Sequence, residues 1–261
     1  MGGGGKLPLV FAKEAKRKGD FIVAFCLKGL TEPGLEGVAD RVHWFEWGQF
    51  QKLLFVLMTE RVKKVVLIGK IKKSMILRNE SVLDEKAKAL FASMKGKSDY
   101  SILKGFSGAF GKMGIELVDV TVYLENLIPS RGVITARKPT GTEEKDIALG
   151  RAAAKALAGF DIGQMVCVKD ECVLALEAAE GTDEAIKRAG VLSGGNFTVV
   201  KMARPNQDMR LDVPIVGPDT VRAMIGARAS VLALEEKKTI LMDRDEAVAL
   251  ADGSNISIVI I

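Results

Sequence analysis

The chain has 261 residues, 48% of them hydrophobic and 27% charged, and this composition excludes wholesale disorder and predicts a folded protein with a sizeable core. Its formal net charge of +5 is only mildly basic, which does not indicate nucleic acid as a partner. The chain has three cysteines without a CxxC pair and a single histidine, which argues against a disulfide framework and a conventional zinc site. We therefore expect the protein to reside in a reducing cytoplasm.

Four glycines follow the first residue and lead into a helical pattern, with Leu7, Val10, Phe11 and Ala15 at helical spacing. In α/β proteins such a turn connects a first strand to a helix, and its bare N–H groups can approach an anion. No strand precedes the glycines in this sequence. They are either what is left of a shortened βα unit or a flexible leader, and this stretch alone favours the leader.

The first half alternates between the two secondary-structure periods. We expect strands at 21–29, 63–71 and 115–124, and helices at 50–60, 81–94 and 100–113. A mixed region separates the first strand from the first of these helices, and its Trp44, Trp47 and His43 are expected to pack in the core or at an edge. Strands that alternate with helices predict βαβ units and a mostly parallel, doubly wound sheet.

Prolines and glycines crowd into residues 127–142, which suits an interdomain connection. We therefore predict an α/β domain over 1–134 and a second, α+β domain over 135–261. Thr142 is expected to cap a helix that runs to about Leu157. The remaining elements predicted for the second half are strands at 164–169, 172–180, 198–203, 231–236, 239–243 and 256–261, and helices at 183–190, 219–225 and 246–252.

The segment RPNQDMRLDVP, residues 204–214, alternates charged and apolar side chains. The alternation predicts a short strand between its two prolines, with Asp208, Arg210 and Asp212 on one face. The simplest explanation of the charged face is that it is exposed to solvent and that its charges pair with one another. The residues of this segment support this explanation and the following alternative equally. The alternative is a site for phosphate groups, in which Lys201, Arg204 and Arg210 neutralise a pyrophosphate while a metal and a carboxylate activate water.

A second charged stretch, EAAEGTDEAIKRAG, begins at the end of a predicted strand. Thr182 or Asp183 can cap the helix that follows. If this strand end meets the charged face of 204–214, then Glu180 or Asp183 can share a Mg²⁺ with one of Asp208 and Asp212. Four residues of strand span roughly 13 Å, so one of these two aspartates is expected to bind the metal and the other an arginine.

Four stretches together carry a resemblance to a known family: GGGKLP, DIGQMVCVKD, LALEAAEGTDEAIKRAG and KMARPNQDMRLDVPIVGPDT. Over nearly its whole length the chain resembles the LpxI-type UDP-2,3-diacylglucosamine pyrophosphatases of lipid A biosynthesis, a pathway of Gram-negative bacteria. The resemblance implies a hydrolase that depends on Mg²⁺ (or Mn²⁺) and cuts the pyrophosphate of UDP-2,3-diacylglucosamine into UMP and lipid X. It also implies a Rossmann-like N-terminal domain and a distinct C-terminal catalytic domain, with the substrate between them.

The resemblance also implies roles for individual residues. Asp212 is the first choice for an essential carboxylate, and the other catalytic candidates are Asp208, Asp183 and Glu180. The implied metal ligands are Asp212, Asp183 and Glu180. The implied substrate-binding residues are Gly3, Gly4, Gly5, Gly69, Lys70, Thr182, Lys201 and Arg210.

The two acyl chains of this substrate predict an apolar lining between the domains. Basic clusters at 13–18 and 63–73 predict a cytoplasmic protein that associates weakly with the anionic inner membrane surface, without nucleic acid. A homodimer is compatible with the sequence. A non-catalytic binder of sugar nucleotides or acyl lipids with the same fold is the alternative function.

Overall fold

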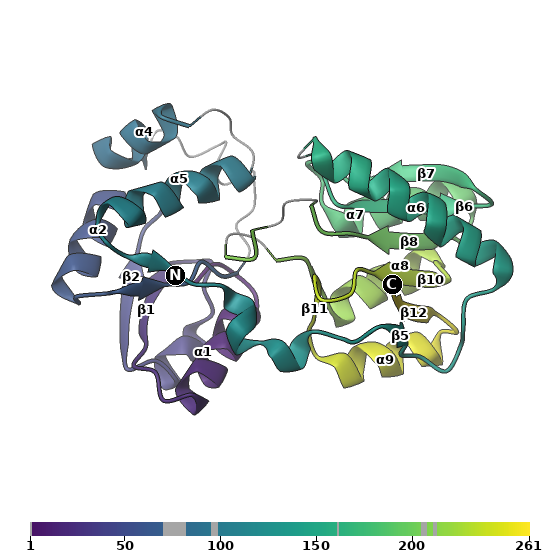
Figure 1. Ribbon diagram of the computed structural model, residues 1–261, viewed down its shortest axis with the longest axis horizontal. Coiled ribbons are helices and arrows are strands. Elements are labelled where there is room, and N and C mark those ends of the chain that lie inside the picture. Colours follow the sequence, from purple (N-terminus) through teal and green to yellow (C-terminus); the bar gives the residue numbers. More distant parts are fainter. Residues whose placement is uncertain (1, 70–81, 95–98, 161, 205–207, 211–212) are drawn as a thin grey trace. The chain divides into compact units, whose positions relative to one another are not determined.

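The computed structural model describes residues 2–69, 82–94, 99–160, 162–204, 208–210 and 213–261 (Figure 1). The chain divides into two compact units. The N-terminal unit comprises Met1–Leu124 with Asp208–Asp212, and the C-terminal unit comprises Glu125–Gln207 with Val213–Ile261. Both units combine helices with sheet, so the predicted mixed α/β class is confirmed at this level.

The N-terminal unit is built from short parallel strands and helices. Its helices are α1 (Leu7–Arg17), α2 (Phe50–Thr59), α4 (Glu85–Ala92) and α5 (Asp99–Lys112), with 3₁₀ turns η1 (Pro33–Gly37) and η3 (Val120–Tyr123). Its strands are β1 (Val23–Leu27), β2 (Arg41–Phe45), β3 (Lys64–Val65) and β4 (Glu116–Leu117). β1 pairs with β2 and β3 pairs with β4, both in parallel, as two separate sheets. The parallel arrangement was predicted, but the strand at 115–124 is shorter than expected because η3 takes its second half.

β2 lies in the region that the sequence left unassigned. Its side chains form local polar contacts: Trp44 Nε1 donates to Glu36 Oε1 at 2.7 Å, and His43 Nε2 lies 2.8 Å from Glu60 Oε1. Trp47, just beyond the strand, packs against the core of this unit. The expectation of core or edge packing for these three residues is therefore confirmed.

The interpretation of the first glycines as a flexible leader is wrong. Gly2, Gly3 and Gly4 are buried, and Gly2 forms parallel bridges with both Cys26 and Ile68. Backbone hydrogen bonds hold this start in place, because the sheet edges on either side supply carbonyl acceptors.

The C-terminal unit contains one larger sheet. Its strands are β5 (Gly132–Val133), β6 (Met165–Lys169), β7 (Cys172–Leu176), β8 (Thr198–Lys201), β10 (Val231–Leu234) and β12 (Ser257–Ile260), with the separate pair β9 (Ile215–Val216) and β11 (Ile240–Leu241). Its helices are α6 (Gly141–Gly159), α7 (Thr182–Ser193), α8 (Pro218–Ala227) and α9 (Arg244–Gly253), with the 3₁₀ turn η4 (Glu125–Leu127).

The six strands are ordered β5-β12-β10-β8-β6-β7. β8, β10 and β12 run parallel, whereas β6 is antiparallel to both of its neighbours. β5 was not predicted, since two residues in a segment rich in proline and glycine leave no period to detect. The carboxyl ends of β7, β8, β10 and β12 consequently meet at one edge of the sheet, which we call the carboxyl edge.

Both faces of this sheet are covered by helices, as the nearly continuous apolar strands require. Val166 and Val200 pack with α6 on one face, whereas Met165 and Val199 pack with α7 and α8 on the other. α6 lies close to the sheet at Gly150, where an added Cβ would stand 2.5 Å from Val200 Cγ2. The core of the C-terminal unit therefore has two layers, separated by the sheet.

The N-cap of α6 lies two residues before the predicted cap. Thr140, not Thr142, is the N-cap: its hydroxyl accepts from the backbone N–H of Glu143, and the Glu143 carboxylate accepts from the backbone N–H of Thr140. Arg137 Nη2 also donates to Glu143 Oε1 at 2.7 Å, which holds this carboxylate in place for the capping box. Thr142 stands three residues before Lys145, so no glutamate occupies the corresponding position of a box that begins at Thr142.

Thr140→Ala is therefore expected to destabilise the protein by about 1 kcal/mol, because one helix N–H loses its acceptor. The control is Thr142→Ala, which removes an exposed threonine inside the first turn and should be nearly neutral. Denaturant unfolding of both variants checks this. Equal losses would show that the box does not stabilise α6.

In the part of the chain that the structure describes, no helix is long and apolar enough to cross a membrane. Of the three cysteines, Cys26 and Cys167 are buried and Cys172, on the edge strand β7, is exposed.

Candidate functional site

The first candidate region is the glycine turn of the N-terminal unit. Gly3 N–H donates to Ile68 O at 2.7 Å, and Gly69 follows with φ 95°, a conformation that favours glycine. A Cβ on Gly69 would stand 2.8 Å from the backbone N of Gly3. The structure thus brings Gly3 and Gly69, two of the predicted substrate-binding residues, together through backbone contact that only glycine permits. Lys70 lies outside the described residues.

This turn leads directly into α1. Gly5 is exposed with φ 88°, and the N-cap Lys6 provides no side-chain acceptor for the first turn. Pro8 stands within that turn, where its missing N–H costs nothing. A glycine turn before an uncapped helix N-terminus is suited chemically to phosphate oxygens.

The second candidate region lies at the carboxyl edge of the C-terminal sheet. Lys201 ends β8, and its ammonium donates to Thr182 Oγ1 at 3.0 Å and to Ile215 O at 3.4 Å. The Thr182 hydroxyl donates to Glu177 Oε1 at 2.8 Å. The other Glu177 oxygen accepts from Gln164 N–H at 3.3 Å. We call Gln164, Glu177, Thr182 and Lys201 the carboxyl-edge cluster.

Each member is placed by a strand or helix end. Glu177 follows β7, Gln164 precedes the antiparallel β6, and Thr182 is the first residue of α7. The N-cap of α7 is Gly181, with φ 87°, so the prediction that Thr182 or Asp183 caps this helix is wrong. Because it is not used as a cap, the Thr182 hydroxyl can bridge Lys201 and Glu177.

Lys201 is only 9% exposed, and both of its hydrogen-bond acceptors are uncharged. Within the residues that the structure describes, no carboxylate lies within 4.0 Å of its ammonium. A buried cation normally needs an anionic partner, because desolvation is costly. This arrangement therefore favours an anionic ligand at the carboxyl edge.

Both carboxylate oxygens of Glu180, a predicted metal ligand, accept hydrogen bonds within the protein. Its Oε1 accepts from Arg188 at 2.7 Å and its Oε2 accepts from the backbone N–H of Ala178 at 3.2 Å. Partial burial raises the pKa of Glu180, but the hydrogen bonds from the backbone and from Arg188 more than offset this and hold it below its ordinary value. Asp183, by contrast, is exposed in the first turn of α7.

The predicted strand at 204–214 is wrong in its described part. Met209 and Arg210 form a turn, because Asp208 Oδ1 accepts from the backbone N–H of Arg210, two residues ahead. The Arg210 guanidinium also holds Asp208 through two bonds, at 2.8 and 2.7 Å. These bonds hold the pKa of Asp208 below its ordinary value, although partial burial raises it.

One of the two aspartates, Asp208 and Asp212, was expected to pair with an arginine. The structure shows that Asp208 pairs with Arg210. Arg210 is correspondingly committed to Asp208, although it was predicted to bind substrate. Residues 205–207 and Asp212 lie outside the described residues, so the first choice for the essential carboxylate keeps its role as a prediction.

Sequence reasoning missed Glu235 and Gln164. Glu235 directly follows β10, and its Oε2 accepts from the backbone N–H of Ala203 at 2.7 Å. The register pairs Leu234 with Lys201, which places Glu235 just beyond Lys201 on the neighbouring strand. A polar residue directly after a buried parallel strand was the available signal.

Two further observations concern metal-binding and thiol groups in the described part of the chain. No group of three or more His, Cys, Asp and Glu side chains there is arranged to hold a metal ion. Burial raises the pKa of Cys167 to about 12, which keeps that thiol protonated and unreactive.

Comparisons with known proteins identify the family of the chain. A model of the LpxI N-terminal domain matches residues 1–127, and a model of the LpxI C-terminal domain matches residues 130–259. A relative from Caulobacter vibrioides (strain ATCC 19089 / CIP 103742 / CB 15), named UDP-2,3-diacylglucosamine pyrophosphatase LpxI, is 25% identical over 265 residues, which cover 97% of this chain and 92% of the relative. Since the two domain models leave almost no residue unmatched, the protein belongs to the LpxI family.

Proposed function

We propose that the protein hydrolyses the pyrophosphate bond of UDP-2,3-diacylglucosamine and releases UMP and 2,3-diacylglucosamine 1-phosphate, the lipid A precursor known as lipid X. The observation that carries this proposal is the match of both family domains along the chain, together with the activity in the name of the Caulobacter relative. The match covers 92% of the relative and 97% of this chain, so the two proteins correspond over nearly their whole lengths.

The buried ammonium of Lys201 supports the same chemistry. A pyrophosphate supplies the negative charge that this cation lacks among the described residues, and Thr182 orients the ammonium by accepting a hydrogen bond from it. As the bond to the leaving phosphate breaks, negative charge grows on the phosphate oxygens. A cation fixed in a poorly solvated place stabilises that charge more strongly than water does.

We further propose that Mg²⁺ or Mn²⁺ is required. When bound, the ion would polarise the phosphoryl oxygens and lower the pKa of an attacking water. The described residues fit this in part: Asp183 offers an exposed carboxylate, whereas both oxygens of Glu180 are engaged by Arg188 and Ala178. Asp183 and Asp212 are therefore the preferred ligand candidates, and Glu180 ranks below them.

Release of UMP from UDP-2,3-diacylglucosamine by the purified protein tests the function. We expect turnover with Mg²⁺ or Mn²⁺, near-complete loss in excess EDTA, and poor rescue by Zn²⁺, because the candidate ligands are carboxylates without thiolate or imidazole. UDP-glucose, without acyl chains, is the matched control substrate and should react poorly. Full turnover in EDTA contradicts the metal requirement, and absence of UMP under all conditions contradicts the function.

We also propose that the protein works at the cytoplasmic face of the inner membrane, where a substrate with two acyl chains resides. The contribution of the first basic cluster should be small: Lys16 pairs with Asp40 and Arg17 pairs with Glu14, which leaves Lys13 and Lys18 as its exposed cations without an ion pair in the described residues. Binding of the acyl chains would then outweigh the attraction between these lysines and anionic lipid.

A further inference from the structure

Helix α2 of the N-terminal unit carries large apolar side chains on its solvent side as well as on its buried side. Phe50, Leu53 and Leu57 are buried in the core of this unit. On the solvent side, Phe55 and Met58 are 65% and 66% exposed. Because successive residues of a helix are turned by about 100°, Phe55 points almost directly away from the buried side. Apolar side chains gathered on an exposed helix face indicate an interaction surface.

Phe55 and Met58 are three residues apart and therefore stand side by side on the surface of the helix. Gln51 and Thr59, one turn from Phe55 in either direction, are exposed and uncharged. α2 has no acidic residue, and its one charged side chain is the exposed Lys52. The outer face of α2, as we call it, consists of Gln51, Lys52, Phe55, Met58 and Thr59.

Basic side chains lie on and beside the outer face of α2. Lys52 belongs to the face itself, and Arg61 and Lys63 follow the end of the helix; all three are exposed. Among the residues that the structure describes, no carboxylate forms an ion pair with any of these three side chains. Cations of this kind attract the phosphates of anionic lipids.

The acidic groups at the two ends of α2 are engaged within the protein. At the C-terminal end, Glu60 accepts from Arg41 at 2.6 Å and lies 2.8 Å from His43 Nε2. At the N-terminal end, Asp84 accepts from the backbone N–H of Gln51 at 2.7 Å. The exposed charge on the outer face of α2 and directly after the helix is therefore positive.

We propose that the outer face of α2 docks the protein on an anionic lipid bilayer, with Phe55 and Met58 inserted among the head groups and the three basic side chains beside lipid phosphates. A helix with this pattern lies in the plane of the interface, because its apolar side chains enter the acyl boundary while lysine and arginine reach back to the head groups. This inference deepens the membrane location proposed above and rests on it, but it does not require the hydrolysis.

A lipid surface fits the outer face of α2 better than a second copy of the chain does. A stable protein interface buries about 800 Å² on each partner, and two apolar side chains provide only a small part of that area. Fluid lipid needs no complementary shape. A few inserted side chains are enough for reversible docking when basic residues add attraction to anionic lipid.

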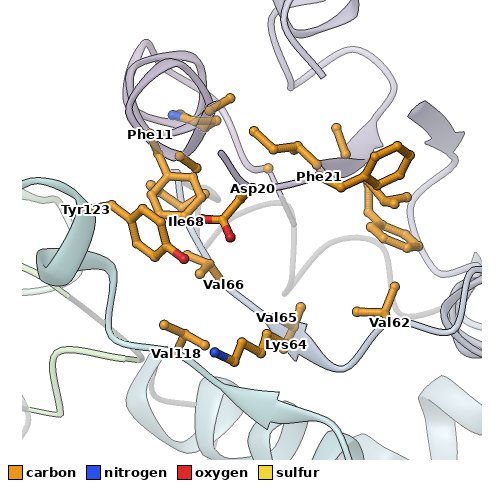
Figure 2. Close-up of a pocket in the computed structure, with 18 of the residues that line it drawn as sticks. Phe11, Asp20, Phe21, Val62, Lys64, Val65, Val66, Ile68, Val118 and Tyr123 are labelled. Carbon is orange, nitrogen blue, oxygen red and sulfur yellow. The ribbon is translucent and has the colours of Figure 1, made fainter. Parts of the chain in front are cut away.

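A cavity in the same unit is the other apolar site for an acyl chain. Its volume is about 450 Å³, and Phe11, Val66 and Val118 are among the side chains that line it (Figure 2). This cavity suits a single chain taken out of a bilayer, whereas the outer face of α2 suits the intact bilayer surface. A soluble fatty acid therefore distinguishes the two sites.

Co-sedimentation of the full chain with phosphatidylcholine vesicles, with and without phosphatidylglycerol and in the absence of substrate, tests the proposal. The double variant Phe55→Ser with Met58→Ser should bind the anionic vesicles about tenfold or more weakly than the parent. The control is Phe160→Ser, which removes a ring that is 80% exposed on the C-terminal unit and should bind like the parent. All three proteins should have the same Tm, because the substituted side chains are exposed.

Each other outcome overturns the proposal. The double variant can bind as well as the parent, the parent can bind neither kind of vesicle, or Phe160→Ser can lose as much binding as the double variant. A parent that is dimeric in solution, with a monomeric double variant, assigns the outer face of α2 to a second copy. If decanoate raises the Tm of the parent and abolishes vesicle binding, the cavity is the lipid site. UMP release enters none of these measurements, so failure here is distinct from failure of the enzymatic assay.

Discussion

Asp212→Asn is expected to lower kcat by about a hundredfold or more and to leave Tm nearly unchanged. Asparagine keeps the shape of the side chain and removes the charge that a divalent ion or an attacking water needs. A carboxylate in a segment with so many charges contributes little apolar burial, so the folded state should tolerate the change. Initial rates of UMP release and a thermal melt of the same preparation check both parts.

The matched control for this variant is Asp208→Asn, four residues earlier. Asp208 is held by Arg210 through side-chain and backbone bonds, so its loss should loosen a turn and cost less than about tenfold in rate. The assignment is wrong if Asp208→Asn is the more damaging of the two. It is also wrong if Asp212→Asn melts far below the parent, since the lost activity would then reflect unfolding.

Lys201→Met is expected to separate function from stability. Methionine keeps the apolar stem of the side chain and deletes the ammonium, which is buried against the uncharged Thr182 and Ile215 carbonyl. The variant should lose about a hundredfold in kcat/KM, while its free energy of unfolding stays equal or increases, because a costly buried charge is gone.

Lys169→Met on the neighbouring strand β6 is the control. Lys169 donates to the carbonyls of Ser193 and Gly195 and so holds the end of α7. Its loss should lower stability and spare activity, which is the opposite pattern. If both variants lose stability and keep activity, Lys201 has a structural role only and the carboxyl-edge cluster does not bind the pyrophosphate.

The sequence predicted most helices and the buried strands because their apolar period is regular. It failed where a single local contact decides the conformation. Asp208 bonds to the backbone N–H of Arg210 and converts an apparent strand into a turn, although the alternation of charge is intact. At α6, Thr140 lies three residues before Glu143, the spacing of a capping box, whereas the residue three after Thr142 is Lys145. Arg137 adds a further partner for the Glu143 carboxylate, which no local pattern reveals.

The candidate site was predictable in part for a similar reason. Lys201 and Thr182 were found because both lie at element ends beside recognisable motifs, and the structure brings them within 3.0 Å. The bridge to Glu177 depends on Gly181, and not Thr182, being the N-cap, which frees the hydroxyl for another partner. Glu235 was missed because its relevance follows from the register of β10 against β8, a long-range property.

The burial of two of the three thiols provides a practical advantage for spectroscopy. Cys26 and Cys167 are each 0% exposed, whereas Cys172 is exposed on the edge strand β7. A maleimide dye or spin label should therefore react at Cys172 in the native protein without any prior removal of cysteines. Cys172 begins β7, whereas Thr182 and Lys201 lie at the carboxyl edge, where β7 ends, so such a label reports on the C-terminal unit from the opposite end of that strand and ligand titrations can be followed by fluorescence in the unmutated chain.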